Sequence, residues 1–257
     1  MIVKNVWISE FERMFKRKKT WVGLFVYLFL LGFECLFLYG VGGQSFYDPD
    51  HVVGLNSLNT APFFLRELGL FLIFVLIPMF VVDSFNGEYT SGAYRLVLLR
   101  PQGRAKLFAI KWSVQGVLIF GLLVFTWLAA TIYGYLVFPN VTEVSFFNTG
   151  ELQSSEAFLY VLTFYAIALL ILLAILTIGS LISTVMPNVI LSYIGIIGFL
   201  IGGLYVSDHF SFFITFTDSI FQVLGKQNMT LIPLAFSIVL ISAILNVTIW
   251  TKRDWME

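Results

Sequence analysis

Long apolar stretches alternate with short polar segments along the whole chain. Residues 112–142, 157–207 and 227–251 contain no Asp, Glu, Lys or Arg. A helix needs roughly 20 apolar residues to cross a bilayer. The second of these stretches is therefore long enough for two crossings, and Met186-Pro187-Asn188 is the natural break between them.

The pattern predicts an all-α integral membrane protein with six spans. We place them at residues 21–41, 63–83, 108–137, 157–185, 189–206 and 231–250. The chain is 59% hydrophobic and 12% charged, whereas soluble domains carry about 25% charged residues, so a water-soluble domain is excluded. No segment outside the spans is long enough for a second domain, and residues 1–257 form a single transmembrane domain.

Basic residues gather on one side of the predicted bundle. Thirteen of the 15 Lys and Arg precede span one, follow span six, or lie between spans two and three. Such residues stay in the cytoplasm, so both termini are expected there. Residues 3–19 are predicted to form an interfacial helix, with aromatic residues toward lipid and Lys16–Lys19 near anionic headgroups. The first 20 residues lack the apolar core of a secretory signal.

The segments on the other side differ in character. Residues 42–61 and 138–156 are expected to be external loops. Residues 207–230 are too apolar for a solvated loop, so two short re-entrant helices before the last span are predicted, with an ordinary loop as the alternative. The single cysteine, Cys35, excludes an intrachain disulfide.

The polar segment 83–104 interrupts the apolar pattern between spans two and three. We expect the chain to leave the membrane after Asp83, with Asn86 as N-cap of a short helix over 87–99 that Pro101 ends. Glu88 would then lie in the first turn, where the helix dipole favours a carboxylate. Gly92 destabilises a helix by about 1 kcal/mol relative to Ala, which indicates close approach by another surface.

This segment resembles the signature of ABC-2 type transporter permeases between their second and third spans. The matching residues are Glu88, Gly92, Leu98 or Leu99, Pro101, Arg104 and Lys111. Ala93 departs from the family, whose members commonly have Thr or Ser there. The resemblance in span number, cytoplasmic termini and interfacial helix covers essentially the whole chain.

The resemblance implies that residues 87–99 form a coupling helix that docks in a groove of a cytoplasmic ATPase. Glu88, Gly92, Arg95, Pro101 and Arg104 would form or brace that contact, with Lys111 completing the signature. A complete transporter of this kind contains two permease copies, identical or related, and two ATPase subunits. ATP and Mg are then expected on the partner ATPase, because this chain has no G-x-x-x-x-G-K-[ST] sequence.

Three further sets of residues are candidate functional positions. Glu34 lies deep in span one, where an ionisable group faces a translocation path or is protonated and bonded to a neighbouring helix. Arg66 and Glu67 form an outer gate or are interfacial charges at a span end. Gly195, Gly198 and Gly202 allow close helix approach, either within the chain or between two permeases.

Other chemistry finds little support in the sequence. His51 and His209 lie outside any H-E-x-x-H, and neither a cysteine cluster nor Gly-x-Ser-x-Gly occurs, so we expect no catalytic residue, no metal and no bound cofactor. No basic stripe indicates nucleic-acid binding.

The sequence therefore predicts a permease subunit of an ABC-2 exporter in a bacterial plasma membrane. A peptide antibiotic, a drug or a lipid-like molecule is the expected cargo. Two alternatives stay open: an ATP-independent channel or ion-coupled carrier, and an integral membrane immunity or scaffold protein.

Overall fold

The computed structural model describes residues 2–41, 45–48, 51–92, 94, 103–147 and 149–253. This part of the chain is mostly helical and contains six helices long and apolar enough to cross a membrane. They are α2 (Lys18–Val41), the span-two helix (Thr60–Thr90), α7 (Arg104–Val137), α8 (Ser154–Val185), α9 (Val189–Val206) and α11 (Leu231–Lys252). Each predicted span falls within one of these helices, so the prediction of six apolar helices is confirmed.

The span-two helix is not uniform. It consists of α3 (Thr60–Phe71), the π-helical η1 (Leu72–Leu76), α4 (Ile77–Val82), the π-helical η2 (Asp83–Gly87) and α5 (Glu88–Thr90). The first π segment precedes Pro78, which has no backbone N–H to continue the α-helical pattern. There the N–H of Ile77 bonds to the carbonyl of Leu72, five residues back.

The predicted start of a new helix capped by Asn86 was wrong, whereas the exit of the chain from the membrane after Asp83 stays a prediction. The helix continues to Thr90, and Asn86 lies inside it rather than at its N-cap. Polar residues can extend a membrane helix when neighbouring elements supply their partners, as happens here. The helix ends at Gly92, whose φ of +74° is left-handed, so Gly92 does not continue a helix from Glu88. Of the predicted coupling helix 87–99, residues 93 and 95–99 lie outside the described residues.

The N-terminal helix α1 (Ile2–Phe15) is shorter than the predicted 3–19, and α2 starts three residues later. Its rings of Trp7, Phe11 and Phe15 contact one another in series. Trp7 Nε1 donates to Ser113 Oγ of α7 at 3.1 Å. The helix is therefore bound to the bundle; that it also lies along a membrane surface stays a prediction.

Two short hairpins replace the loops predicted at 42–61 and 138–156. Strands β1 (Ser45–Asp48) and β2 (His51–Gly54) pair antiparallel, as do β3 (Glu143–Ser145) and β4 (Glu151–Gln153). These strands are too short for a clear alternating pattern, which explains why the sequence did not reveal them. The 3₁₀ helix η3 (Asp208–Phe213) and α10 (Phe216–Leu224) occupy the predicted 207–230 segment as two short helices; their re-entry into a membrane stays a prediction.

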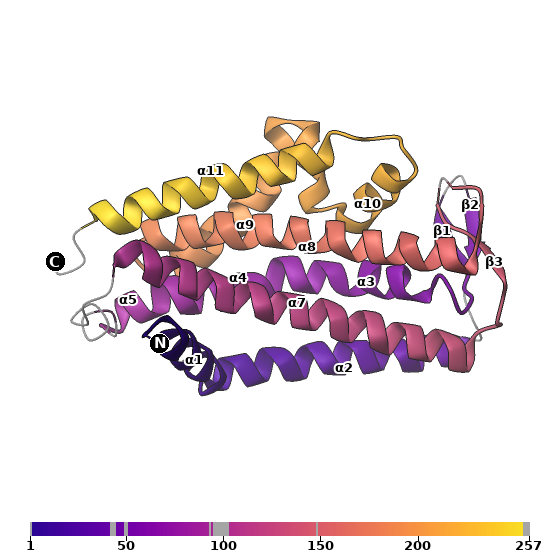
Figure 1. Cartoon of the computed structure of the whole chain (residues 1–257), viewed down its shortest axis with the longest axis horizontal. Coiled ribbons are helices and arrows are strands. Elements are labelled where there is room, and N and C mark those ends of the chain that lie inside the picture. The colour runs from indigo at the N-terminus through magenta and orange to yellow at the C-terminus, as the bar shows by residue number, and fades with distance from the viewer. Residues whose placement is uncertain are drawn as a thin grey trace.

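The elements form a long bundle with two distinct ends. The N-terminus, α1, α5 and the end of α11 lie at one end, and the hairpins and α10 lie toward the other (Figure 1). Span two and α8 are central in the bundle. In the 18-residue apolar stretch of each, 67% is buried inside the protein, against 33% or less in the other four helices.

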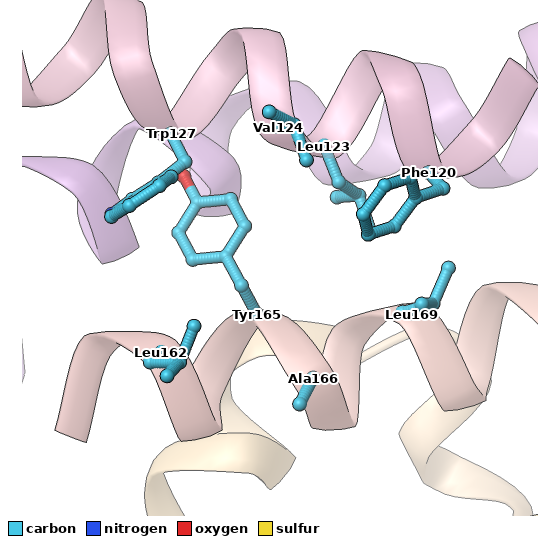
Figure 2. Close-up of a pocket in the computed structure, with 8 residues that line it drawn as sticks. All are labelled: Phe120, Leu123, Val124, Trp127, Leu162, Tyr165, Ala166 and Leu169. Carbon is cyan, nitrogen blue, oxygen red and sulfur yellow. The ribbon is translucent and has the colours of Figure 1, made fainter. Parts of the chain in front are cut away.

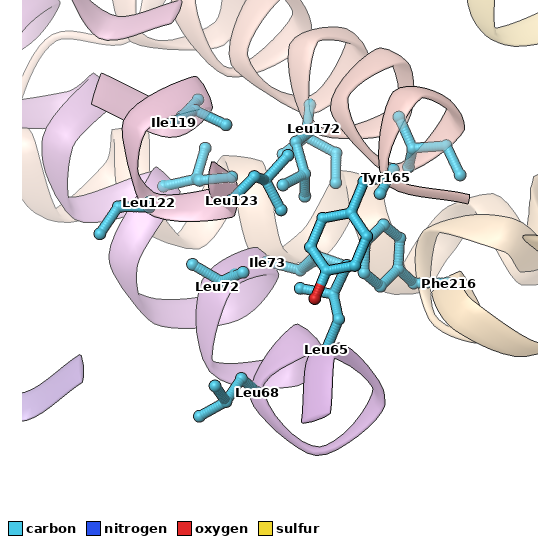
Figure 3. Close-up of a cluster of buried hydrophobic side chains, with 14 of the residues drawn as sticks. Leu65, Leu68, Leu72, Ile73, Ile119, Leu122, Leu123, Tyr165, Leu172 and Phe216 are labelled. Carbon is cyan, nitrogen blue, oxygen red and sulfur yellow. The ribbon is translucent and has the colours of Figure 1, made fainter. Parts of the chain in front are cut away.

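The core lies where these two helices meet α7 and α10 (Figure 3). It includes Leu65, Leu68, Leu72, Ile73, Ile119, Leu122, Leu123, Tyr165, Leu172 and Phe216, all of which are buried. In a bilayer, close packing rather than removal from water stabilises such contacts.

Candidate functional site

A buried group of charged side chains joins α1, the end of span two and the start of α7. We call it the charged cluster; its members are Glu10, Arg13, Arg17, Asp83, Glu88 and Lys111. It lies at the bundle end that carries the N-terminus, next to the segment expected to couple to a partner (Figure 1).

Lys111 is the most buried member, with none of its side chain exposed. Its Nζ donates to Glu10 Oε2 at 3.0 Å and also to Glu88 Oε2. Both carboxylate side chains are only 6% exposed. Since an uncompensated buried charge is strongly destabilising, these three groups hold α1, span two and α7 in one relative position.

Arg17, in the short link between α1 and α2, joins both carboxylates of span two. Its Nη1 donates to Asp83 Oδ2 at 2.7 Å, and its Nη2 pairs with Glu88. Burial by itself lowers the pKa of Arg17, but the charges of Glu88 and Asp83 raise the pKa above its ordinary value. Arg13 completes the cluster at 2.8 Å from Glu10 and 3.4 Å from Glu88.

Local geometry explains why the two carboxylates face the same guanidinium. Asp83 and Glu88 are five residues apart, which would place them on different faces of an α-helix. A π-helical turn bonds residue i to residue i+5, so η2 brings them to one face. On α1, Glu10 and Arg13 are three residues apart and share a face, and Arg17 follows in the link to α2.

The predicted coupling residues separate into three groups. Glu88 and Lys111 meet in the charged cluster. Arg104 instead lies at the start of α7, where its Nη1 donates to the Arg253 carbonyl at 2.8 Å, just after α11. Gly92 is exposed at the end of α5, and Arg95 and Pro101 lie outside the described residues.

The sequence analysis assigns no site role to four members of the cluster: Glu10, Arg13, Arg17 and Asp83. Arg13 and Arg17 count there only among the basic residues before span one, and Asp83 only as the end of span two. The one signal in the sequence is the spacing of Glu10, Arg13 and Arg17 by three and four residues, which is also that of an exposed helix face.

The ends of α8 and α11 are tied to the same region. Asn86 Nδ2 donates to the carbonyls of Ser183 and Met186, at 3.1 Å and 2.7 Å. Arg253 donates to the Thr184 carbonyl, and Trp250 Nε1 donates to Thr184 Oγ1 at 3.2 Å. Hydrogen bonds from spans two and six thus satisfy carbonyls at the end of α8 that a helix leaves unpaired.

The predicted outer gate residues lie toward the other end of the bundle. Arg66 Nε pairs with Asp218 Oδ1 at 3.3 Å and joins α3 to α10 beside a cavity of about 190 Å³ that Glu67 also lines. Glu34 on α2 is partly buried, and neither Glu34 nor Glu67 forms an ion pair with a described residue.

The three glycines of α9 do not share one environment. A Cβ on Gly195 would come within 2.9 Å of Ile182 Cγ2, so Gly195 packs against α8. A Cβ on Gly198 or Gly202 would meet no described atom within 4 Å. The first glycine therefore has a role inside the chain, whereas the other two leave an open surface on α9.

A cavity of about 300 Å³ lies between α7 and α8 (Figure 2). Its lining residues are Phe120, Leu123, Val124, Trp127, Leu162, Tyr165, Ala166 and Leu169. The hydroxyl of Tyr165 is already satisfied, since it donates to the Ala61 carbonyl at 2.9 Å. The cavity suits hydrocarbon rather than an ion.

Comparison with known proteins identifies the family. A family model described as "Protein of unknown function (DUF2705)" matches residues 22–256. No curated protein matches the chain. Within the described ranges, no group of three or more His, Cys, Asp or Glu could hold a metal ion. The chain belongs to the DUF2705 family.

Proposed function

We propose that this DUF2705 protein is the permease subunit of an ABC-2 type transporter and that a separate ATPase drives it. The observation that carries the proposal is the charged cluster. Glu88 lies near the start of the polar segment 83–104, Lys111 lies after its end, and the two side chains form an ion pair. A segment held by buried charges at both ends can pass a displacement on to both spans.

The mechanism we propose uses this mechanical connection. A cytoplasmic ATPase binds the exposed part of the segment and moves when it hydrolyses ATP. Because Glu88 also binds Arg17 and Arg13, the displacement reaches α1 together with spans two and three. Two permease copies, each with its ATPase, would then alternate the access of a path between them.

Placement in the bacterial plasma membrane with cytoplasmic termini belongs to the same proposal. The end of the bundle with α1, α5 and the end of α11 carries most of the Lys and Arg residues. The positive-inside rule favours the cytoplasm for that end.

The cargo we propose is amphipathic: a peptide antibiotic, a drug or a lipid-like molecule. The cavity between α7 and α8 supports a cargo with an apolar portion, since the lining of the cavity offers hydrocarbon contacts only. We propose export as the direction of transport, because the chain resembles ABC-2 exporters.

An ion-coupled carrier is the second candidate. Glu34 and Glu67 favour it, because they form no ion pair with any described side chain and such carboxylates can bind a transported cation or proton. This carrier would work without any ATPase.

Copurification tests the proposal. The chain is purified from its native membrane in mild detergent, and a stoichiometric ATPase with a P-loop is expected beside it. Ser91→Trp adds bulk at an exposed position next to Gly92 and should abolish its recovery. Ser155→Trp, equally exposed at the far end of the bundle, is the control and should keep the ATPase. Absence of an ATPase from the unmodified complex would contradict the proposal and leave the carrier or an immunity protein.

A further inference from the structure

We propose that span two bends about Pro78 and that Tyr193 of α9 latches this bend. The latch is the hydrogen bond from Tyr193 Oη to the Phe74 carbonyl, at 2.6 Å. It joins spans two and five by a contact that is independent of any partner protein.

The latch arises from a local defect in the helix. In an α-helix the N–H of residue 78 would bond to the carbonyl of residue 74, but proline has no N–H. The π-helical η1 precedes this point, and the Ile77 N–H is already used by Leu72. The Phe74 carbonyl therefore lacks its ordinary α-helical donor, and the Tyr193 hydroxyl donates to it.

The surroundings make this donor hard to replace. Leu72, Ile73, Leu76 and Ile77 next to the bend are all buried, and none exposes more than 1% of its surface. A carbonyl within a membrane has no water to bond to, so water does not replace the Tyr193 hydroxyl if it is lost.

The helix that carries the donor is only lightly packed. In the 18-residue apolar stretch of α9, 17% is buried inside the protein, against 67% in that of span two. Few other contacts therefore oppose a separation of Tyr193 from Phe74. This hydrogen bond is therefore a main link between α9 and span two at the bend.

The lower half of span two has a second bond of the same kind. Ser183 lies four residues before Pro187, which has no N–H to donate to the Ser183 carbonyl. Asn86 Nδ2 donates to that carbonyl instead, at 3.1 Å. Phe74, before the bend, is thus linked to α9, and Asn86, after it, is linked to α8. The part of span two after Pro78 is the part that would move when the latch opens.

A mutant cycle with spin labels tests the latch in the full-length chain. Labels at Leu70, 54% exposed before the bend, and at Thr90, exposed after it, report the angle between the two halves of span two. Cys35→Ala removes the native cysteine. Tyr193→Phe should add a second distance population and lower Tm by about 2–4 °C.

Pro78→Ala provides the decisive comparison. It restores a backbone N–H for the Phe74 carbonyl, so adding Tyr193→Phe to Pro78→Ala should change neither the distance distribution nor Tm. Equal effects of Tyr193→Phe in the two backgrounds would overturn the proposal, as would an unchanged distribution in the Pro78 protein.

Two tyrosines serve as matched controls. Tyr160 has a buried hydroxyl with no hydrogen-bond partner in the described part of the chain, so Tyr160→Phe should leave both measurements unchanged. Tyr165→Phe removes a bond to the Ala61 carbonyl away from any bend; it should lower Tm without adding a distance population. A new population in Tyr165→Phe would show that any lost hydroxyl loosens the bundle and would contradict the latch. No ATPase is present in these measurements, so their outcome is separate from that of the copurification.

Discussion

Lys111 carries a positive charge into a position where its side chain has no exposure. Such a charge is tolerated only because Glu10 and Glu88 both accept from it. Its Nζ also lies 5.3 Å from the centre of the Tyr94 ring, an arrangement that favours a cation. Lys111, which matches the signature of ABC-2 permeases, therefore holds α1, span two and α7 together.

Lys111→Met should therefore destabilise the protein strongly, since it leaves two buried carboxylates without their shared cation. Breaking a buried pair costs about 3–5 kcal/mol, which corresponds to a Tm lower by roughly 6–20 °C. Thermal unfolding in detergent measures it. Lys106→Met, on the same helix but exposed, is the control and should change Tm little. Equal Tm values for the two variants would show that the cluster contributes nothing to stability.

At the scale of elements, the apolar pattern predicted the helices well and their ends poorly. Residues 189–206 were placed with the bounds that α9 has, because Asn188 caps the helix locally. The end of span two depends instead on Arg13 and Arg17, more than 65 residues earlier. A contact so distant leaves no local pattern, and a single π turn changes which side chains share a face. For this reason the sequence predicts Asn86 as a helix N-cap, whereas Asn86 is a hydrogen-bond donor inside the helix.

The π turn at Asp83–Gly87 can be tested by removing one residue. Deletion of Gly87 should convert the turn to α-helix and leave the Asp83 and Glu88 side chains four residues apart, still on the face that meets Arg17. The folded yield in size-exclusion chromatography should then stay well above that of Lys111→Met. Deletion of Gly150, exposed between β3 and β4, is the control for loss of a residue, and the two deletions should fold alike. A Gly87 deletion that folds as poorly as Lys111→Met would show that the π turn does more than bring the two carboxylates to one face.

Basic and acidic residues lie mostly at opposite ends of the molecule. The sequence predicts this separation, because each span takes the chain to the other side and every polar segment can therefore be assigned to one end. Basic residues flank spans one, two, three and six on one side, whereas the β3–β4 hairpin carries Glu143 and Glu151 on the other, with Glu156 in the first turn of α8. The two ends also differ in construction. The first is held by ion pairs among three helices, and the second by short strands and by Arg66 with Asp218. The first is the end that our proposal joins to a cytoplasmic partner.

Cysteine labelling of intact cells decides which end faces the cytoplasm. In the Cys35→Ala background, Ser155→Cys should react with a membrane-impermeant maleimide, and Thr90→Cys should react only after the membrane is opened. Both positions are exposed, so a difference between them reports access from outside rather than burial. The reason for the expected result is that moving most of the Lys and Arg across a bilayer is opposed by the positive-inside bias. Labelling of Thr90→Cys in intact cells would place the charged cluster outside, where no ATP is hydrolysed, and the transporter proposal would fail with it.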